Sequence, residues 1–278
     1  KRLRLWAALL KKGYQRRADM KDRFFRVIIP TYNGGQFLPR MVDCIRRQTF
    51  TDYHLVIVDD QSTDGTWDIV KKLKPDKAVQ VESKGYAAGA RNKGMEFYKG
   101  DKYTMWLDDD DILIDDDVFQ RIHDNAVAHD LPDVIRLNYI KTKLSTGLRG
   151  NHHDRYSDDI TPADICLDIM GGMPWSKAVK TDKCVEFPLG LVIDDCFQHI
   201  CQMDVCETAS AVQEDCYEWL VREGSCTTNR QSVMYQSGWY MEIALLMRKK
   251  DSLIHDWAQE AIERRIAWIK RHHIRGDM

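Results

Sequence analysis

The chain has 278 residues, of which 44% are hydrophobic and 30% charged, and its formal net charge is −2. This composition is typical of a soluble globular protein and gives no general attraction to nucleic acids or membranes. No apolar run approaches the roughly 18 residues of a membrane-spanning helix, and eight cysteines in so long a chain are not the pattern of a small disulfide scaffold. We therefore expect a reduced, cytoplasmic protein with one large domain, or a domain with a helical appendage.

Residues 1–23 predict a basic amphipathic helix, with Leu3, Trp6 and Leu10 on one side among lysines and arginines. The apolar run within it is too short for a secretory signal. The helix either packs on the body of the protein, lies on a membrane surface or joins a segment outside this sequence. Basic ends of this kind are compatible with peripheral contact to the inner face of the membrane, although solvated helix faces are the simpler interpretation.

Residues 24–107 alternate between apolar strands and amphipathic helices. Strands are predicted at residues 24–29, 55–58, 79–81 and 103–107, and helices at residues 38–45, 66–73 and 85–94. The turn residues beginning at Pro30 are expected to end the first strand, and Thr63 or Asp64 to cap the second helix. This alternation predicts an α/β fold whose parallel sheet is covered by helices on both faces.

Polar residues directly follow three of the predicted strands, at residues 30–33, 59–60 and 108–111. The carboxyl ends of parallel strands meet at one edge of a sheet, where ligands bind in such folds. Each stretch alone reads equally well as a surface turn, but three that converge on one edge favour a binding site.

Residues 108–111 are four consecutive aspartates. Two carboxylates about 4 Å apart repel by roughly 1 kcal/mol in water and roughly 4 kcal/mol at an effective dielectric constant near 20. A bound divalent cation would relieve this repulsion, and Mg²⁺ typically takes one or two carboxylates plus substrate phosphates. A solvated acidic loop is the alternative for this stretch considered alone.

Four stretches in this half carry a resemblance to a known family: VIIPTYN at residues 27–33, VDDQSTDG at 58–65, GARNKG at 89–94 and LDDDD at 107–111. In this order and spacing they resemble the nucleotide-sugar half of glycosyltransferase family 2. That family has the GT-A fold, a Rossmann-like, mostly parallel central sheet with helices on both faces. Residues 174–177, 187–195 and 217–225 resemble segments of its second half, and the likeness covers about residues 24–230.

The resemblance implies a set of donor-binding residues. Asp110 would hold Mn²⁺ or Mg²⁺, with Asp108 or Asp109 assisting and reaching the ribose. Asp60 would accept a hydrogen bond from the ring N–H of the base. Arg91 would clamp the diphosphate through its forked donors, or form a structural salt bridge. The base pocket would be lined by Pro30, Thr31, Tyr32 and Asn33.

On the acceptor side, the resemblance assigns Trp175 and Lys177 to the segment before the acceptor site. It makes Asp195 the general base, with Asp194 as its neighbour in place of the family's usual glutamate. Such a base typically contributes 10²–10⁴-fold to the rate. Alternatively, Asp194 and Asp195 simply cap the helix that follows them.

The remaining segments predict less chemistry. Residues 141–165 are polar and are expected to form a loop, either an acceptor-side lid or a disordered stretch. Two helices are expected from Ser237 onward, and a core-packing stripe is predicted at Ile254, Trp257, Ala258, Ala261, Ile262 and Ile269. The spacing of Cys196, His199, Cys201 and Cys206 matches no recognised zinc pattern.

These patterns divide the chain into an N-terminal helix (1–23), a GT-A domain (24–235, with halves 24–115 and 116–235) and C-terminal helices (236–278). We predict an inverting, metal-dependent glycosyltransferase that uses a nucleotide-diphosphate sugar, most often a UDP-sugar in this family. Its acceptor would be a polysaccharide or lipid-linked glycan. The alternatives are transfer to hydroxylated bases of DNA, or a non-catalytic nucleotide-sugar-binding protein.

Overall fold

The computed structural model describes residues 21–82, 86–150, 160–167, 172–191, 195–223 and 233–272. The helix predicted at residues 1–23 lies outside these residues except for its last three, and so does Asp194. Among the described residues, no helix is both long and apolar enough to cross a lipid bilayer.

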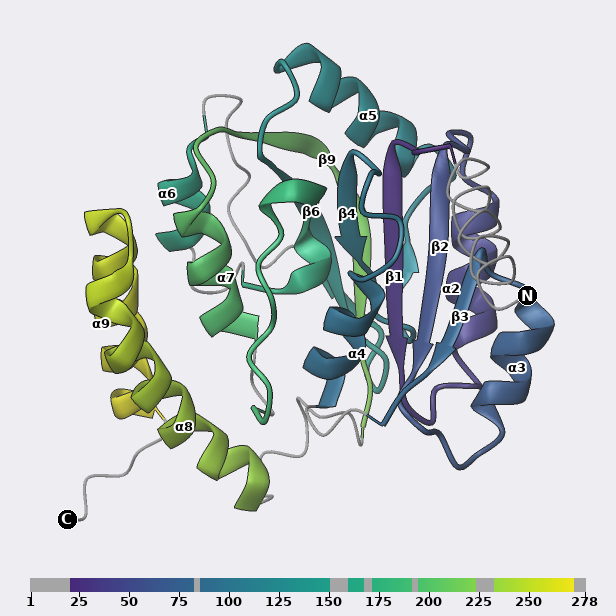
Figure 1. Cartoon of the computed structure of the whole chain (residues 1–278). Helices are drawn as coiled ribbons and strands as arrows, with labels where there is room; N and C mark the ends of the chain where they lie inside the picture. The colour runs from purple at the N-terminus through teal and green to yellow at the C-terminus, as the bar shows by residue number, and fades with distance from the viewer. Residues whose placement is uncertain are drawn as a thin grey trace, which may run out of the picture.

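One mixed sheet forms the centre of the described structure, in the order β3-β2-β1-β4-β8-β6-β9-β5, with β7 paired to β6 (Figure 1). Strands β1 to β4 are all parallel, as the sequence predicts, and β6 and β9 also run parallel. Strand β8 joins the two parallel parts through antiparallel pairings. The strands are β1 (Phe25–Thr31), β2 (Tyr53–Asp59), β3 (Lys77–Gln80), β4 (Tyr103–Trp106), β5 (Ile112–Leu113), β6 (Val134–Lys143), β7 (Leu148–Gly150), β8 (Lys177–Lys180) and β9 (Ala209–Val221).

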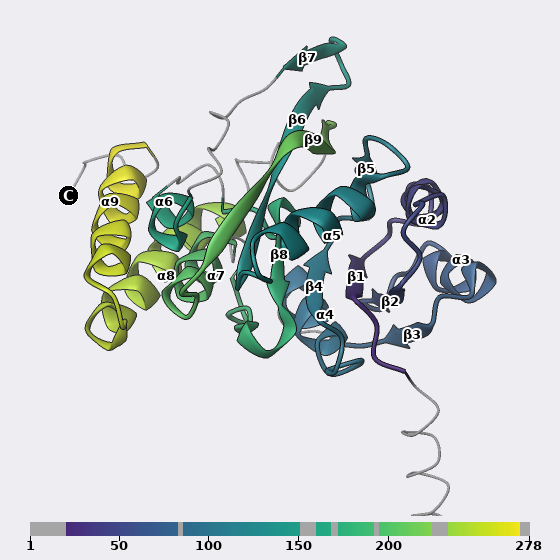
Figure 2. The ribbon, with the colours of Figure 1, turned by 90° about the horizontal axis from the view of Figure 1, so that it is seen from above.

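Helices cover both faces of this sheet, and each face has its own apolar core. On one face the core includes α2 (Leu38–Arg46), α3 (Thr66–Leu73) and α5 (Val118–Ala128). The other core includes α4 (Tyr86–Gly94), α6 (Pro162–Leu167), α7 (Asp195–Asp204), α8 (Val233–Lys249) and α9 (Asp256–His272). Figure 2 shows α2 and α5 on one side of the sheet and α4 on the other.

Strand β1 illustrates how the sequence produces these two layers. Val27 and Ile29 enter one core, whereas Ile28 enters the other, because successive side chains of a strand point to opposite faces. Gly94 lies so close to β1 that a Cβ atom there would be 2.4 Å from Ile28 Cγ2. The glycine therefore allows α4 to pack tightly against the strand.

Strand β1 also corrects a prediction, because it continues through Pro30 and Thr31 instead of ending before them. The partner β4 pairs with β1 only as far as Ile28. The backbone groups of Ile28 face β4, and those of Pro30, two residues later, face the same side. Because β4 has ended at that point, the N–H group that proline lacks would have no partner strand there. Proline is tolerated in a strand at such an unpaired edge.

The predicted loop at residues 141–165 is also wrong in part. Strand β6 extends to Lys143 and forms a hairpin with β7, and α6 begins at Pro162. Gly147 has a positive φ of 66°, as the turn of this hairpin requires. The strands are polar at this exposed end, so the apolar periodicity that identifies buried strands is absent. Residues 151–159 lie outside the described structure.

The other boundaries differ only slightly from the predictions. Helix α3 begins after Gly65, and Asp64 Oδ1 accepts a hydrogen bond from the Thr66 backbone N–H at 2.9 Å. Two C-terminal helices are present as predicted, although α8 begins at Val233. The stripe on α9 packs in the core at Ala258, Ala261, Ile262 and Ile269, but Ile254 precedes the helix and is 72% exposed.

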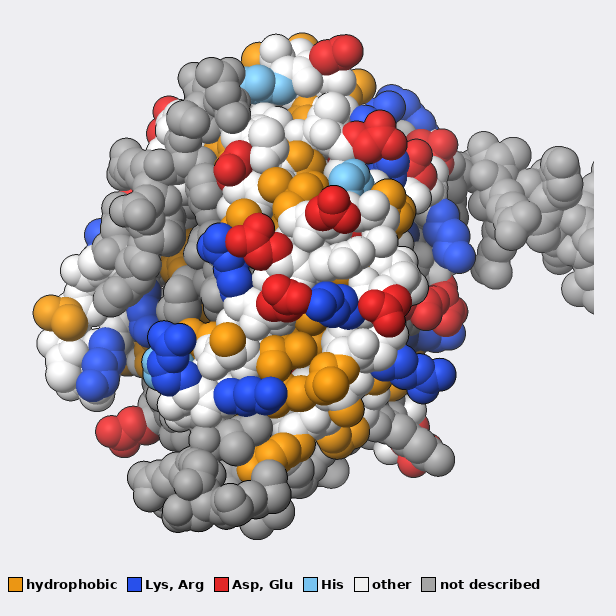
Figure 3. All heavy atoms as spheres, turned by 90° about the vertical axis from the view of Figure 1, so that its left-hand side faces the viewer, with side chains coloured by type: hydrophobic (Ala, Val, Ile, Leu, Met, Phe, Trp, Pro, Cys, Tyr) orange, Lys and Arg blue, Asp and Glu red, His pale blue; other side chains and the backbone are white. Residues whose placement is uncertain are grey.

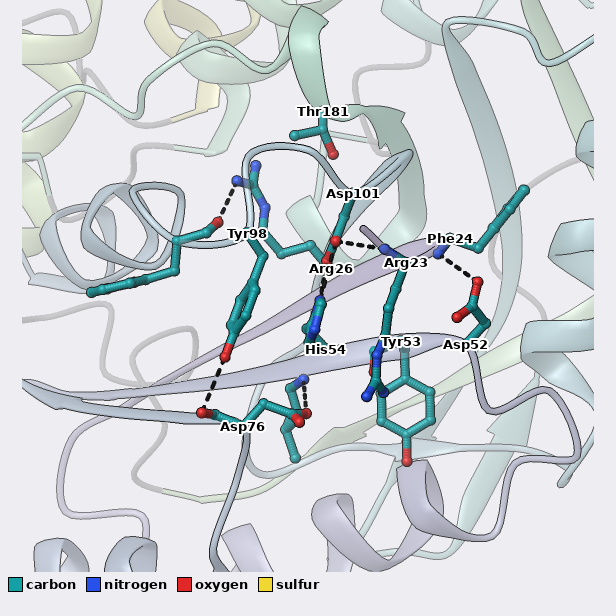
Figure 4. A network of polar contacts seen from close by, with 12 residues as sticks. Arg23, Phe24, Arg26, Asp52, Tyr53, His54, Asp76, Tyr98, Asp101 and Thr181 are labelled. Atoms are coloured by element: carbon teal, nitrogen blue, oxygen red, sulfur yellow. Dashed lines mark hydrogen bonds and ion pairs between the residues drawn. The ribbon is translucent and has the colours of Figure 1, made fainter. Parts of the chain in front are cut away.

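A polar network joins the amino-terminal ends of β1, β2 and β4, at the edge opposite the predicted site (Figure 4). Asp101 accepts a hydrogen bond from the Arg23 backbone N–H at 2.8 Å, and its other oxygen is 2.8 Å from His54 Nδ1. The ring of Tyr98 stacks on His54 with centroids 3.8 Å apart. The Arg26 guanidinium donates to Thr104 Oγ1 and to two backbone carbonyls. The charged side chains at this edge are thus hydrogen-bonded to other groups of the same chain.

Candidate active site

The first two aspartates of the acidic run contact β1 and α4. The Arg91 guanidinium donates to Asp108 Oδ1 at 3.1 Å, and Thr31 Oγ1 donates to Asp109 Oδ2. Gly34 borders the same carboxyl so closely that a Cβ atom there would be 1.8 Å from Asp109 Oδ2. The polar ends of β1 and β4 therefore meet at one edge of the sheet, as the sequence predicts.

The third aspartate, Asp110, lies between two arginines from distant parts of the chain. Arg222, just after β9, donates through Nε to Asp110 Oδ2 at 2.9 Å. Arg40 of α2 donates to the backbone carbonyl of Asp110 at 2.6 Å. The predicted metal ligand is therefore already in an ion pair with a side chain of this chain.

The fourth aspartate, Asp111, is only 1% exposed and has a structural role. Its carboxyl accepts hydrogen bonds from the Tyr217 hydroxyl and the Leu220 backbone N–H, both at 2.8 Å. The Tyr217 hydroxyl also accepts a hydrogen bond from the backbone N–H of Asp108 at 3.2 Å. Strand β9 thus fixes the backbone of the acidic run.

Crowding and burial perturb the titration of this run. Burial raises the pKa of Asp108 to about 6, because the lowering effect of Arg91 is outweighed by desolvation and by the charges of Asp110 and Asp195. Burial likewise raises the pKa of Asp109 to about 7, opposed by the Thr31 hydrogen bond and reinforced by Asp110 and Asp108. The local field therefore favours any added positive charge.

These carboxylates suit a hard divalent cation, because they offer oxygen ligands at a site of excess negative charge. Within the described part of the chain, no three His, Cys, Asp or Glu side chains converge as a complete metal site. The donor set therefore fits an ion that takes one or two carboxylates here and completes its coordination with diphosphate oxygens, as Mg²⁺ commonly does.

Arg91 links the donor-side aspartates to the predicted general base. It is 5% exposed, donates through Nη2 to Asp108 and lies with Nη1 3.4 Å from Asp195 Oδ1. The Asn92 side chain donates to the Phe187 carbonyl and accepts from its N–H, both at 2.8 Å. Arg91 therefore forms salt bridges within the chain, with Asp108 and Asp195. A further contact of Arg91 with a diphosphate stays a prediction.

Asp195 is the first residue of α7, and its side chain is 30% exposed. Asp108 is similarly accessible, at 31%. A single guanidinium contacts both carboxylates, so they lie close to one another although 87 residues separate them. This shared contact is the central geometric feature of the candidate site.

The predicted base-binding residues surround the end of β1. Tyr32 is 63% exposed, and Asn33 adopts a positive φ of 52°. The Asn33 side chain accepts a hydrogen bond from the Thr63 backbone N–H at 2.8 Å, and Asp60 donates its backbone N–H to the Thr31 carbonyl at 2.9 Å. Pro30 is buried within β1. The roles of these residues in donor binding stay predictions.

The two predicted acceptor-side residues are buried. Trp175 is 3% exposed and stacks on Tyr217 with ring centroids 4.5 Å apart. Lys177 is fully buried and donates from Nζ to the Met173 carbonyl at 2.8 Å and to the Gly172 carbonyl at 3.4 Å. Burial lowers the Lys177 pKa to about 7. Both side chains contact other parts of the chain, Trp175 the ring of Tyr217 and Lys177 the backbone before η2 (Pro174–Ser176). A direct contact of either residue with the acceptor stays a prediction.

Arg222 and Arg40 are site residues that the sequence analysis missed. A signal for Arg222 was present, because the segment beginning at Tyr217 resembles the family's closing strand and Arg222 falls within it. Arg40 carries no such signal, since it lies on the exposed side of an ordinary amphipathic helix.

Comparison with known proteins identifies the family. The model described as "Glycosyl transferase family 2" matches residues 26–165, which is half of the chain. The chain belongs to glycosyltransferase family 2. The matched segment includes β1 to β4 and the acidic run, so the family resemblance seen in the sequence is confirmed.

Named relatives within this family share about a third of the aligned residues. The Escherichia coli protein WfaP, a UDP-Glc:alpha-D-GlcNAc-diphosphoundecaprenol beta-1,3-glucosyltransferase, is 36% identical over 100 residues, which are 35% of this chain and 39% of WfaP. Glycosyltransferase GlyG of Streptococcus pneumoniae is 34% identical over 146 residues, which are 51% of this chain and 45% of GlyG. The chain therefore matches less than half the length of either relative.

Solved structures confirm the GT-A fold. S. aureus TarS residues 1–349, in complex with UDP-GlcNAc, superpose with a TM-score of 0.69 and 20% identity over 89% of this chain and 72% of that chain. The mannosyltransferase PcManGT from Pyrobaculum calidifontis, in complex with GDP-Man and Mn²⁺, gives a TM-score of 0.57 and 17% identity over 93% and 77%. At these identities the likeness concerns the fold.

Proposed function

We propose that this family 2 protein is an inverting, metal-dependent glycosyltransferase that moves a sugar from a nucleotide diphosphate to a hydroxyl acceptor. One observation carries the proposal: Arg91 contacts both Asp108, after β4, and Asp195, at the start of α7. A donor-side carboxylate and a candidate general base therefore lie on either side of one guanidinium. Such an arrangement suits a reaction in which a leaving group and an attacking hydroxyl occupy neighbouring positions.

On the donor side, the nucleotide would lie over the ends of β1 and β2. Tyr32, which is exposed, would stack on the base, and Asp60 would accept a hydrogen bond from the ring N–H of the base. Asp110 and Asp108 would hold Mn²⁺ or Mg²⁺. When bound, such an ion stabilises the negative charge that develops on the departing diphosphate. Arg222, now paired with Asp110, is positioned to bind a diphosphate oxygen once that carboxylate is engaged elsewhere.

On the acceptor side, Asp195 would accept the proton of the attacking hydroxyl. The hydroxyl oxygen forms a bond to the anomeric carbon as the bond from that carbon to the diphosphate oxygen breaks. Attack from the face opposite the leaving group inverts the anomeric configuration. Arg91 contacts Asp195 Oδ1 through one guanidinium nitrogen, which would orient the carboxylate toward the acceptor hydroxyl.

The relatives suggest the substrate classes. WfaP is named for a UDP-glucose donor and a lipid-diphosphate acceptor, and the TarS structure contains UDP-GlcNAc. We propose a UDP-sugar as donor and a polysaccharide or lipid-linked glycan as acceptor for this chain. With an acceptor of that kind, the protein would work at the inner face of the membrane.

The first test compares donor binding with turnover. A panel of nucleotide sugars, with Mn²⁺ or with EDTA, should give a metal-dependent rise in Tm for the correct donor, because a ligand stabilises the state that binds it. Hydrolysis or transfer of that donor should require the metal. Metal-dependent binding without any turnover would instead favour a non-catalytic sensor.

The second test uses site variants. Asp195→Asn should lower transfer by roughly 10²–10⁴-fold while donor binding is kept, since only the acceptor loses its base. Asp110→Asn should abolish the metal-dependent rise in Tm. Asp124→Asn, an exposed change on α5, is the matched control and should leave both properties unchanged. Unaltered transfer by Asp195→Asn would refute the assigned mechanism.

A further inference from the structure

A buried ion pair joins the two C-terminal helices. Arg265 of α9 donates to Glu242 of α8 through Nε at 2.8 Å and Nη2 at 3.1 Å. The two residues are 5% and 0% exposed. The guanidinium carbon of Arg265 also lies 5.2 Å from the ring centroid of Trp239 and 4.8 Å from that of Trp268. Arg265 is therefore held in one place by four short-range contacts.

Stability alone explains this pair poorly. Removing two charges from water has a large desolvation cost, and a pair of well-packed apolar side chains often joins two helices as well or better. The position of Arg265 suggests another use for its charge. Helices α8 and α9 lie next to α7, the helix that begins with Asp195 (Figure 1).

Arg265 borders the first turn of α7 directly. A small cavity of about 10 Å³ is lined by Arg265 and Ala261 of α9, by Cys166 of α6, and by Cys196, His199 and Ile200 of α7. Cys196 immediately follows Asp195.

The segment that Lys177 holds also contacts this turn. A Cβ atom on Gly172 would be 3.3 Å from Cys196 Sγ and 3.7 Å from His199 Cβ, so the backbone at Gly172 touches α7. Lys177 Nζ contacts the carbonyls of Gly172 and Met173. Two buried basic residues therefore border the first turn of α7, Lys177 through the backbone at Gly172 and Arg265 across the cavity.

We propose that Arg265, fixed by Glu242, is a positioning residue for Asp195, so that the C-terminal helices are part of the catalytic unit. This inference rests on the proposed role of Asp195 as general base. Arg91 anchors one oxygen of Asp195 from the donor side, and Arg265 fixes the turn that carries the residue. A displacement of about 1 Å in a reacting group can lower the rate by about 10²-fold.

The test is Arg265→Met, with Arg264→Met as the matched control. Arg264 precedes Arg265 on the same helix and pairs with Glu260 at 2.6 Å, but both side chains are half exposed. Arg265→Met should lower kcat for transfer about 10- to 100-fold, with the donor KM within twofold of wild type. Arg264→Met should leave kcat unchanged. A kcat for Arg265→Met equal to that of wild type would overturn the proposal.

A double variant separates positioning from stability. Arg265→Met alone leaves Glu242 buried without its partner, which is expected to lower Tm. Glu242→Leu combined with Arg265→Met removes both charges and should recover Tm. If Arg265 positions Asp195, kcat should stay low in this stable double variant. Recovery of kcat together with Tm would show that the pair only holds the helices together, and would refute the inference.

A conservative variant and a reference variant complete the design. Arg265→Lys keeps the charge but cannot keep both contacts to Glu242, so an intermediate kcat is expected. Wild-type kcat in Arg265→Lys, together with a low value in Arg265→Met, would still support a role for the charge. Asp195→Asn distinguishes the two proposals. If Asp195→Asn retains transfer, the proposed function fails. If Asp195→Asn is inactive while Arg265→Met keeps the wild-type kcat, only the role of Arg265 fails.

Discussion

The two ends of the parallel strands β1, β2 and β4 handle charge in opposite ways. At the amino-terminal end, the buried carboxylate of Asp101 meets His54 and a backbone N–H, with Arg26 close by. Asp52 and Asp76 each accept a further backbone N–H there. At the carboxyl end, Asp108, Asp110 and Asp195 form ion pairs with only two arginines among the described residues, Arg91 and Arg222. Asp109 and Asp111 accept hydrogen bonds from uncharged donors, and Arg40 contacts the backbone of Asp110. The first end is balanced within the chain. The second is left with excess negative charge, which is the condition for binding a cation and a diphosphate.

Figure 3 shows one face of the molecule, on which side chains of both charges occur. The face drawn there carries acidic and basic side chains side by side, with a group of hydrophobic side chains in its lower half. No single sign of charge covers it, in agreement with the net charge of −2.

The largest expected effect comes from the residue that joins the two halves of the charged edge. Arg91→Met would leave Asp108 and Asp195 without their common partner, so we expect kcat/KM to fall by about 10²-fold or more. Lys93→Met on the same helix removes only an exposed ion pair and should change little. Steady-state transfer assays on both variants test this. Comparable activity in the two would mean that Arg91 has no part in arranging the site.

The next largest effect is expected at Gly34, whose backbone lies close to the carboxyl group of Asp109 at the end of β1. Gly34→Ala would place a Cβ atom 1.8 Å from Asp109 Oδ2 and 2.7 Å from Thr31 Oγ1, so the carboxyl group must move. We expect metal-dependent donor binding to weaken about tenfold, or about 1.4 kcal/mol. Gly150→Ala is the control, since no atom lies within 4 Å of its added Cβ. Titration calorimetry with UDP and Mn²⁺ measures both. Equal affinities would contradict the structure at this position.

The opposite edge should affect folding and not chemistry. Asp101→Asn removes the partner of buried His54 and should lower the free energy of unfolding by about 1–3 kcal/mol. Turnover at saturating substrate should stay at the wild-type value, because the site lies at the other end of the strands. Urea unfolding and transfer assays test the two parts. An equal stability loss in Asp68→Asn, an exposed pair with Lys71, would mean that burial is not the cause.

The smallest effect is a pH dependence of the metal-free protein. Burial raises the pKa of Asp108 to about 6 and of Asp109 to about 7, above the usual 3.8. Between about pH 4 and 7 the folded state therefore holds protons that the unfolded state has released. These two groups should make the free energy of unfolding fall as pH rises through this window.

Asp109→Asn isolates part of that slope. Relative to wild type, the variant should gain stability on the order of 1 kcal/mol between pH 5 and pH 7.5, because it has no carboxyl to deprotonate. Urea unfolding in EDTA at the two pH values measures the difference. A pH dependence identical to that of wild type would show that Asp109 ionises normally in the folded chain.

Much of the donor half was predictable because its signals are local. Apolar runs marked β1, β2 and β4, helical spacing marked α2 and α3, and the polar stretches after the strands marked the site edge. Arg91 left two interpretations open at the sequence level. Only the fold reveals that Asp195 lies on its other side, since that contact joins residues 104 positions apart.

Other features depend on tertiary context that periodicity does not carry. Trp175 and Lys177 were assigned to the segment before the acceptor site, but their sequence pattern did not reveal that both are buried, because packing against Tyr217 and contact with the backbone at Gly172 decide their environment. Ile254 fits the apolar stripe by spacing but lies before the helix begins, and it is exposed. The Glu242–Arg265 pair has no sequence signal at all, since its members belong to different helices.

The hydrogen bonds from β9 to Asp111 also bear on how the protein is made. The Leu220 N–H and the Tyr217 hydroxyl that hold this carboxyl belong to a segment synthesised about a hundred residues later. A nascent chain still attached to the ribosome can pair β1, β2 and β4 early and can form the contacts of Thr31, Arg40 and Arg91 with the acidic run. The carboxyl of Asp111 gains these two partners only when β9 has emerged. The contacts that hold the acidic run are therefore completed late in synthesis, after β1 to β4 have been made.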